Sequence, residues 1–308
     1  MDDDCETIVL YHYPCMDGLA ALWAFGHNNP KALYTHRGIN YGDPIPATCK
    51  GAHVIMLDFS FKRDQMIELI RMAKSVLVLD HHESAERELQ GLEATGELLG
   101  TPTEVVFDMD RSGCRITWDY YADGAEPPQP LLWIEDRDLW RFRYHGTTRQ
   151  FAAYLSSTDL NPQTMARVME SSPQKQHEYV AEGQAILRKQ QRDLDVLIHG
   201  VHTAITTRAR IGRHTVPAIN LPHMMASDAG HRLAASGDVP FAAVFTVTAT
   251  EVRISLRSMH GRDHYPEAVN VSYIAEQYGG GGHAGAAGFS VTHDYFFNEI
   301  LITESNDD

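Results

Sequence analysis

The chain has 308 residues, of which 43% are hydrophobic, and it carries a formal net charge of -15 at pH 7. This length exceeds that of one ordinary small domain, so two sizeable hydrophobic cores are expected. The negative charge repels extended polyphosphate backbones, so long duplex nucleic acid is not expected as a partner. A small or short phosphate ligand, held by local cations and a metal, is compatible with it.

The N-terminal residues and the cysteines indicate a cellular compartment. The opening sequence MDDDCETIVLYHYP is acidic, unlike a secretory leader, and no apolar run typical of a membrane span occurs. We therefore expect a cytoplasmic protein without membrane contact. The oligomeric state stays open, with a homo-oligomer as one alternative. The cysteines show no CxxC spacing, so reduced thiols are expected. They are Cys5, Cys15, Cys49 and Cys114.

The first half of the chain alternates predicted strands and helices. Short, continuous apolar runs are typical of strands buried on both faces of a parallel sheet. In this chain they cover residues 7–10, 54–57 and 76–79. Amphipathic helical stretches cover residues 17–25 and 62–73. This order predicts an α/β domain over residues 1–160 with a doubly wound, mostly parallel sheet.

The second half has a different pattern. Residues 161–199 are polar with apolar residues at helical spacing, which predicts a helical connector. Beyond it, a helix is expected over residues 224–235, between strand-like stretches. Those stretches cover residues 202–211, 215–221, 241–248 and 252–256. A second, smaller α/β domain is therefore expected over residues 200–308.

Polar side chains follow the predicted strands at the point where each strand ends. They are His12, Cys15, Asp17, Asp58, Asp80, His81 and His82. Because the carboxyl ends of parallel strands meet at one edge of a sheet, we expect these side chains to converge. One such Asp could simply cap a helix, and one such His could be structural. Several together predict a site for Mn²⁺, Mg²⁺ or Fe²⁺, because converging carboxylates need a cation.

The order of these residues resembles the motifs of the DHH phosphoesterase superfamily. Residues 12–18, with the sequence HYPCMDG, resemble its first motif, and Asp58 resembles the second. The Asp-His-His sequence at 80–82 resembles the third. Asp136, within LLWIEDRDLWRF, resembles the fourth, for which Asp138 is a nearby competitor.

The C-terminal part of the chain extends this resemblance. A GGGGH sequence at 279–283, followed by AGAAGF, and an arginine in ISLRS are similar to motifs of the DHH-associated C-terminal domain. A glycine run allows consecutive N–H groups to cradle an anion, although alone it could be a flexible turn. A guanidinium matches phosphate oxygens in a bidentate manner. The expected substrate-binding residues are Arg257, Gly280, Gly281, Gly282 and His283.

The resemblance implies a role for each matched residue in the first domain. The implied metal ligands are Asp17, Asp58, His81 and Asp136, with His12 as a further candidate for the first metal position. Asp58 would bridge two ions where two are bound. His82 would meet the substrate, and Asp80 would orient the metal-binding imidazole beside it. His82 and Asp80 are therefore the expected catalytic pair.

The first motif departs from the family pattern. Many members have an Asp where this chain has Cys15, and their motif histidine lies one residue farther from the final Asp. Hard ions prefer carboxylate oxygen to sulfur. We therefore expect one tightly bound Mn²⁺, or Mg²⁺ or another divalent ion in its place, and a weaker second ion. Cys15 is interpreted as a small buried filler, and its role as a ligand stays open.

Three aromatic residues lie close to the fourth motif, namely Trp133, Trp140 and Phe142. Aromatic rings can stack on nucleobases. We interpret all three instead as core residues around the helix that carries Asp136.

The resemblance implies a metal-dependent phosphoesterase. The glycine-rich C-terminal motif is most similar to members that act on short oligonucleotides, dinucleotides and related small nucleotide phosphates. A Mn²⁺-dependent, exonuclease-like phosphodiesterase is therefore expected. One alternative is a pyrophosphatase or exopolyphosphatase, whose substrate has no base. The other is a non-catalytic nucleotide sensor, which the Cys15 departure suggests.

Overall fold

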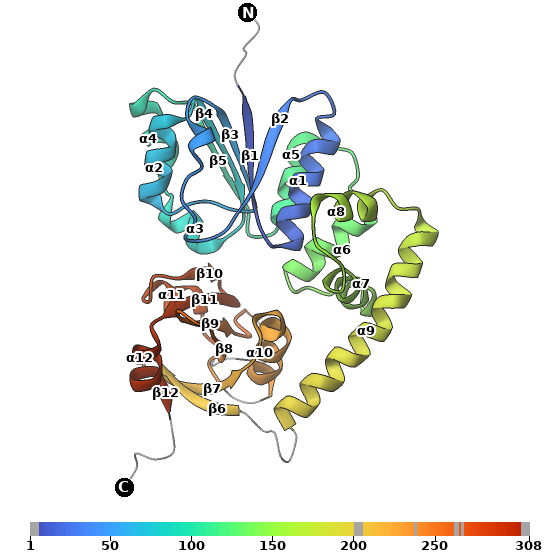
Figure 1. The fold of residues 1–308 in the computed structure, drawn as a ribbon, viewed down its shortest axis with the longest axis vertical. Helices are drawn as coiled ribbons and strands as arrows, with labels where there is room; N and C mark the ends of the chain where they lie inside the picture. Colours follow the sequence, from blue (N-terminus) through green and yellow to red (C-terminus); the bar gives the residue numbers. More distant parts are fainter. Residues whose placement is uncertain (1–5, 200–205, 237–238, 262–264, 266–267, 303–308) are drawn as a thin grey trace, which may run out of the picture. The chain divides into compact units, whose positions relative to one another are not determined.

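The computed structural model describes residues 6–199, 206–236, 239–261, 265 and 268–302 (Figure 1). The chain separates into two compact units, Met1–Gln190 and Gln191–Asp308. Cys5 and the first four residues of the strand predicted at 202–211 lie outside the described residues. Among the helices described, none combines the length and apolar character that crossing a bilayer requires.

A parallel sheet of five strands forms the centre of the first unit. Its strands are β1 (Thr7–His12), β2 (Tyr34–Ile39), β3 (His53–Leu57), β4 (Ser75–Asp80) and β5 (Thr103–Phe107). Their order across the sheet is β2-β1-β3-β4-β5, and every neighbouring pair is parallel. This is one of the common strand orders of doubly wound folds, so the predicted fold class is confirmed.

Helices cover both faces of this sheet, as Figure 1 shows. Along β1, Val9 packs into one core, whereas Ile8 and Leu10 pack into the other, because successive side chains of a strand alternate between faces. The first core contains residues of α1 (Met16–Asn28), α5 (Gly113–Tyr121), α6 (Gln129–Asp138), α7 (Gly146–Ser156) and α8 (Pro162–Met169). Over the other face lie α2 (Arg63–Met72), α3 (Glu83–Glu88), α4 (Leu92–Leu99) and the short 3-10 helix Ala47–Cys49.

A long helix, α9 (Pro173–His199), links the two units. Near its start, Tyr179 packs into the core of the first unit. Near its end, Leu194 and Ile198 pack into a core of the second unit. Together with α8, this helix occupies the segment in which a helical connector was predicted.

The second unit contains a mixed sheet of seven strands in the order β10-β11-β9-β8-β7-β6-β12. They are β6 (Thr206–Ile211), β7 (His214–Asn220), β8 (Ala242–Val247), β9 (Val252–Arg257), β10 (Gly281–His283), β11 (Ala286–Val291) and β12 (Leu301–Ile302). Among the described strands only β7 and β8 pair in parallel. The chain between them forms the 3-10 helix His223–Met225 and α10 (Ala226–Ala235), because a parallel pair needs a crossover connection.

Each face of the mixed sheet has its own core. On one face, α10 packs against alternate residues of β8 such as Ala242 and Val244. On the opposite face, a second core contains Phe245 and residues of α11 (Val271–Glu276) and the π-helical turn Phe296–Ile300. The short helix α12 (His293–Tyr295) precedes that turn. The second unit is therefore an α/β domain, as predicted.

The interpretation of three aromatic residues as core is correct for one of them only. Trp133 is buried in the first core of the first unit. Trp140 and Phe142 lie in the loop between α6 and α7 and are half-exposed. An arginine guanidinium, rather than apolar side chains, covers one face of each ring, since Arg137 lies over Trp140 and Arg149 over Phe142.

Candidate metal centre

Five of the predicted site residues lie at the carboxyl ends of three neighbouring strands. β1 ends at His12, Asp58 directly follows β3, and β4 ends at Asp80, which precedes His81 and His82. The chain leaves β1 for β2 on one side and returns to β3 on the other, so the strand order reverses at this point. Carboxyl ends of strands at such a reversal commonly form ligand-binding sites.

Asp58 contacts histidines at the ends of two neighbouring strands at this edge of the sheet. Its side chain is buried, and neither carboxylate oxygen has a hydrogen-bond partner among the described residues. Its backbone has a φ of 55°, in a left-handed region that costs a non-glycine residue about 1–2 kcal/mol. Strain of this kind persists where the surrounding structure holds it, often at functional sites. A buried carboxylate in this condition requires a cation nearby.

Two imidazoles flank the Asp58 carboxylate. His12 Nδ1 lies 3.6 Å from Asp58 Oδ2, and His81 Nε2 lies 3.2 Å from Asp58 Oδ1. Burial opposes ionisation of Asp58, but the neighbouring His12 and His81 rings outweigh it and hold its pKa well below the usual range. Asp58 is therefore ionised at neutral pH.

A second carboxylate, from Asp17, reaches the site from the first turn of α1. Its Oδ1 accepts hydrogen bonds from Ser112 Oγ at 2.8 Å and from the backbone N–H of Cys114 at 3.2 Å. Its Oδ2 has no hydrogen-bond partner among the described residues and lies 3.7 Å from His81 Nε2. Burial, and next the negative charge of Asp58, raises the pKa of the Asp17 carboxyl well above its usual range. A bound cation would favour its ionised form.

The imidazole of His81 lies among three carboxylates. Its Nε2 atom is 3.2 Å from Asp58 Oδ1, 3.4 Å from Asp138 Oδ2 and 3.7 Å from Asp17 Oδ2. Burial lowers the pKa of His81, but the carboxylates, Asp58 first, raise it to about 10. Two ligand atoms that each lie about 2.1 Å from one ion are about 3.0–3.4 Å apart. The Asp58 and Asp138 distances lie in this range and the Asp17 distance is slightly longer, and donor atoms of Asp17, Asp58 and His81 are close enough together to hold one metal ion.

A second group of possible ligands shares Asp58. Donor atoms of Asp17, Asp58 and His81 lie within 4.8 Å of one another, and so do donor atoms of His12, Asp58 and His82. Asp58 belongs to both groups, which is the geometry that a bridging carboxylate needs. Since the second group has only one carboxylate, it should hold a hard cation more weakly.

The structure assigns Asp80 a different contact from the one predicted. Asp80 Oδ1 lies 2.7 Å from Nδ1 of His82 and also accepts the backbone N–H of His81, so it orients the His82 ring and not the His81 ring. Its other oxygen, Oδ2, accepts a hydrogen bond from Ser60 Oγ at 2.8 Å. The prediction was wrong because the carboxylate reaches the second imidazole of the motif. Burial lowers the pKa of His82, but the Asp80 carboxylate outweighs this effect and raises it.

At the fourth motif the geometry favours Asp138 over Asp136. Asp136 is buried, and its carboxylate accepts hydrogen bonds from the backbone N–H of Arg143 and from Thr148 Oγ1. These contacts hold the loop that follows α6, so Asp136 is not positioned as a ligand. Asp138, at the last residue of α6, is the carboxylate 3.4 Å from His81. Of the two candidates at this motif, Asp138 therefore lies nearer the other possible ligands than Asp136 does.

Cys15 is not the buried filler that was expected. The residue precedes α1, is half-buried, and belongs to neither ligand group. Burial, followed by the negative charges of Asp58 and Asp138, raises the pKa of its thiol well above the usual value. A protonated thiol is a poor ligand for a hard cation.

In the second unit the structure brings Arg257 and His283 into one row of the sheet. Arg257 on β9 and His283 on β10 both pair with Ala286 on β11, which lies between them. Directly paired residues project from the same face of a sheet, so both side chains lie on one face with only a methyl group between them. Arg257 Nη2 donates to Ser227 Oγ at 2.9 Å, which fixes the direction of the guanidinium.

The predicted glycines have a packing role. Gly281–His283 forms strand β10 rather than an open anion nest. A side chain at Gly280 would place its Cβ 2.0 Å from Gly288 O, and Gly282 has a φ of 137°. The glycines therefore allow β10 to lie close against β11, and this close packing positions His283.

Three residues that position the site were missed in the sequence. Ser60 and Ser112 donate to the carboxylates of Asp80 and Asp17, respectively. A Cβ at Gly113 would lie 2.4 Å from the Cβ of Asp58, so only glycine fits there. The Ser-Gly pair at the start of α5 was the available signal, since serine is common before the first turn of a helix.

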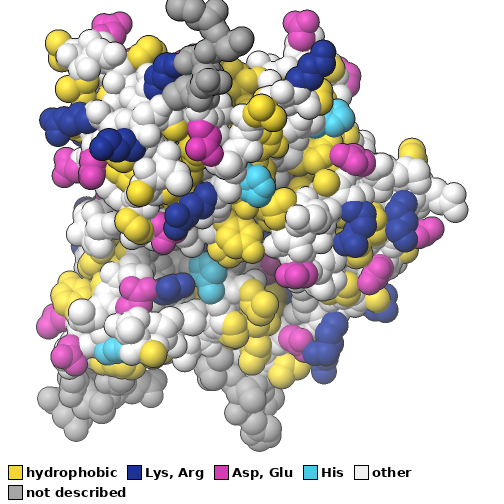
Figure 2. Space-filling view, turned by 45° about the horizontal axis from the view of Figure 1, so that its top comes forward, with side chains coloured by type: hydrophobic (Ala, Val, Ile, Leu, Met, Phe, Trp, Pro, Cys, Tyr) yellow, Lys and Arg dark blue, Asp and Glu magenta, His cyan; other side chains and the backbone are white. Residues whose placement is uncertain are grey.

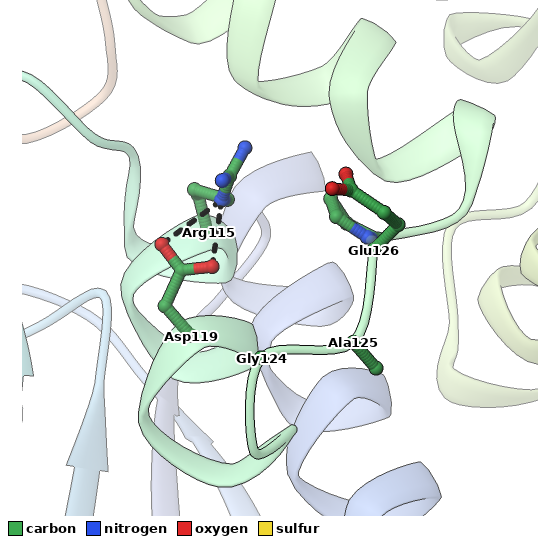
Figure 3. Close-up of a pocket in the computed structure, with 6 residues that line it drawn as sticks. Arg115, Asp119, Gly124, Ala125 and Glu126 are labelled. Atoms are coloured by element: carbon green, nitrogen blue, oxygen red, sulfur yellow. Dashed lines mark hydrogen bonds and ion pairs between the residues drawn. The ribbon is translucent and has the colours of Figure 1, made fainter.

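A surface pocket of about 260 Å³ lies apart from these residues (Figure 3). It is lined by Arg115, Asp119 and residues 124–127. The Nε atom of Arg115 donates to both oxygens of Asp119, so the one cation of this pocket is already paired, and Glu126 adds a further negative charge. None of the predicted site residues lines it.

No family model matches the sequence. The uncharacterized protein R106 of Acanthamoeba polyphaga mimivirus is 27% identical over 317 aligned residues, which cover 93% of this chain and 68% of that protein. A pGpG-specific phosphodiesterase, PggH, from Vibrio is similar over 94% of both chains, with 12% identity and a TM-score of 0.42.

RecJ from Thermus thermophilus, solved with Mn²⁺, is similar over 94% of this chain, with 16% identity and a TM-score of 0.51. The chain therefore has a RecJ-like fold. It covers 50% of the RecJ chain. At this identity the likeness concerns the fold, so the chemistry has to be argued from the residues themselves.

Proposed function

We propose that the chain is a metal-dependent phosphoesterase that hydrolyses phosphodiester bonds in short oligonucleotides, dinucleotides or related small nucleotide phosphates. The observation that carries this proposal is the Asp58 carboxylate, which is buried, ionised and shared by two groups of possible ligands. Asp17 and His81 would share the main position for a divalent cation with Asp58, Asp138 lies beside His81, and His12 lies near a second position. Mn²⁺ is the expected ion, and RecJ, which has a similar fold, was solved both with Mn²⁺ and with Mg²⁺.

A divalent cation held by these residues would activate water for attack on phosphorus and neutralise charge on the phosphoryl oxygens. The residues of the chain prepare this position. Ser112 and the backbone of Cys114 hold Asp17 by one oxygen and leave the other directed toward His81. Gly113 allows α5 to approach Asp58 closely, which limits the movement of its carboxylate.

His82 is the proposed proton donor or phosphate-binding group. A carboxylate can only accept, so the 2.7 Å contact with Asp80 Oδ1 places a proton on His82 Nδ1. The second ring nitrogen, Nε2, is then the atom that can act on a substrate. Because Asp80 raises the pKa of His82, the ring can carry a second proton near neutral pH and donate it to a leaving oxygen. Ser60 holds the other oxygen of Asp80.

The second unit would bind the part of the substrate away from the reacting phosphorus. Arg257 offers a fixed guanidinium, and His283 lies on the same face one strand beyond Ala286. Such a pair suits a phosphate or the edge of a base. A short ligand is favoured over a long duplex, because acidic and basic side chains are interspersed on the face of the described molecule that Figure 2 shows.

The test is a comparison of substrates with purified protein and added Mn²⁺. We expect turnover of linear dinucleotides and short oligonucleotides to exceed that of pyrophosphate and polyphosphate. Faster turnover of pyrophosphate or polyphosphate would favour the alternative enzyme. Binding of nucleotide with no turnover of any substrate would favour a sensor.

The same assay tests the site. Asp58→Asn and His81→Ala should each lower turnover about a thousandfold or more while unfolding stays cooperative, because loss of metal ligation removes several kcal/mol of transition-state stabilisation. Asp64→Asn and His36→Ala, at exposed positions of the same unit, are matched controls. Turnover near that of the unmodified chain in both site variants, with metal removed and then Mn²⁺ restored, would contradict the assignment.

A further inference from the structure

The loop between α6 and α7 concentrates positive charge in an acidic chain. No Asp or Glu occurs between Asp138 and Asp159, whereas arginines occupy positions 141, 143 and 149. The loop sequence at 139–145 is LWRFRYH, in which cations and aromatic rings alternate. We refer to these seven residues and the flanking Arg137 and Arg149 as the arginine-aromatic loop. Its local charge is opposite to the net charge of the protein.

The aromatic rings of this loop are stacked against arginines. Arg137 Cζ lies 4.0 Å from the centroid of the Trp140 ring, and Arg149 Cζ lies 3.6 Å from that of Phe142. The two rings meet edge to face, with centroids 4.9 Å apart. A guanidinium over a ring face is held there by cation–π attraction.

The backbone of the loop is held in an unusual conformation. Trp140, Phe142 and His145 have φ values of 55°, 53° and 53°, in the left-handed region that bulky residues rarely adopt. Asp136 holds this conformation, because its backbone oxygen accepts the N–H of Arg141 at 3.0 Å and its Oδ1 accepts that of Arg143 at 2.8 Å. The buried Asp136 therefore keeps the loop backbone in one conformation.

Two arginines of the loop are available to a ligand. Arg143 is exposed, and its side chain has no hydrogen bond or ion pair among the described residues. Arg141 pairs at 3.2 Å with Asp110, whose side chain is 96% exposed, so this contact is weak and easily exchanged. Tyr144, between other loop residues, is 37% exposed. The loop thus offers cations and rings together.

The position of the loop connects it with the candidate metal centre. Asp138, 3.4 Å from His81, is only two residues before Trp140. Two residues span at most about 7 Å of chain, so the loop begins beside the site. Alternating cations and aromatic rings bind single-stranded nucleic acid, since phosphates pair with the cations and bases stack on the rings.

We propose that the arginine-aromatic loop binds the part of a single-stranded nucleic acid that extends beyond the reacting nucleotides. This inference rests on the proposed function. The loop would set how much more tightly the protein binds a strand longer than a dinucleotide than it binds the dinucleotide itself. Aromatic rings favour nucleic acid over polyphosphate, which has no bases to stack. The site residues cut the bond, and the loop holds the remaining strand.

The test is fluorescence anisotropy with a labelled oligothymidylate of about ten nucleotides, within the site sizes of single-strand binders. The variants are Arg143→Ala and Phe142→Asn, the second chosen because Asn tolerates a positive φ. Arg143→Ala should weaken binding severalfold and reduce the slope of log Kd against log salt by about 0.7. Phe142→Asn should weaken it about tenfold. Arg71→Ala, an exposed arginine on α2, is the matched control and should bind as the unmodified chain does.

Hydrolysis of a dinucleotide, measured in parallel, separates this inference from the proposed function. Both loop variants should hydrolyse the dinucleotide at the unmodified rate, with cooperative unfolding preserved. Loop-dependent binding of the oligonucleotide without any hydrolysis would support the loop and overturn the enzyme. Unchanged binding in both variants, or no binding by the unmodified chain at low salt, would overturn the loop. An effect of Arg143→Ala alone, with competition by polyphosphate, would overturn base stacking as the mode of binding.

Discussion

The candidate sites on the two sheets of the chain carry opposite charges. They also differ in how far hydrogen bonds within the chain already hold their charged side chains. At the edge of the parallel sheet, Asp17 and Asp58 carry buried oxygens that no hydrogen bond within the described chain satisfies. On the mixed sheet, Arg257 is already held by Ser227. The first site thus leaves two buried carboxylates that a divalent cation would neutralise, whereas the guanidinium of the second already has a fixed direction. Substitutions should therefore have larger and more metal-dependent effects in the first unit.

The largest contrast is expected between the two carboxylates of α6. Asp138→Asn should lower Mn²⁺ affinity at least tenfold and leave stability nearly unchanged, since its side chain only contacts the site. Asp136→Asn should lower the free energy of unfolding by about 1–3 kcal/mol, because a buried, hydrogen-bonded carboxylate is replaced. Calorimetric titration and thermal unfolding measure the two effects. The reverse pattern would restore Asp136 as the ligand.

A smaller effect is expected on the mixed sheet. Arg257→Ala should raise KM about tenfold and lower kcat much less, because the guanidinium grips a group away from the reacting phosphorus. Steady-state kinetics with a dinucleotide measures both constants, and Arg208→Ala on β6 is the control. A loss confined to kcat would place Arg257 with the reacting atoms and remove the distinction between the two sheets.

The raised pKa of Asp17 predicts an effect on the stability of the metal-free protein. An acid whose pKa is raised on folding loses stability as pH rises from its unfolded pKa, about 3.9, toward the folded value. Metal-free Asp17→Asn should therefore unfold a few degrees higher than the unmodified chain at pH 7, and the difference should vanish near pH 3. Thermal unfolding in chelator at both pH values tests this. A lower melting temperature at pH 7 would show that Asp17 is already neutralised within the chain.

The smallest expected effect concerns the second metal position. Its group contains His12, Asp58 and His82, with Cys15 nearby but outside it. Cys15→Asp should raise the affinity for a second Mn²⁺ without changing the first, because a carboxylate suits a hard cation better than a protonated thiol. Calorimetric titration of metal-free protein measures both. Two equally tight ions in the unmodified chain would mean that another residue completes the position.

Sequence patterns predicted the central strands of the parallel sheet but not its edges. β1, β3 and β4 are flanked on both sides and consist of buried apolar residues, which leave a clear signal. β2, with the sequence YTHRGI, and β5, with TEVVF, are edge strands with half-exposed or exposed residues. They lack the continuous run of buried apolar residues that marks a strand flanked on both sides, so no local pattern marks them.

The candidate site, like the parallel sheet, was predictable from the sequence only in part. Strand ends located His12, Asp58 and the 80–82 motif, because parallel topology brings them together whatever the details. Asp136 and Asp138 lie two residues apart on a helix and therefore point about 200° apart, so only one can face the site. The rotation of α6 decides which, and packing of Leu131 and Ile134 in the core sets that rotation.

The close approach of Gly113 to Asp58 has a consequence for which sequence changes the protein tolerates. Even a methyl group at position 113 would collide with the Asp58 side chain, and Asp58 cannot retreat easily from its left-handed backbone. A residue without any side chain is thus as constrained as a metal ligand. In a saturation mutagenesis experiment, position 113 should reject every substitution and score beside Asp58, while its neighbour Arg115 on the solvent side of α5 should accept many.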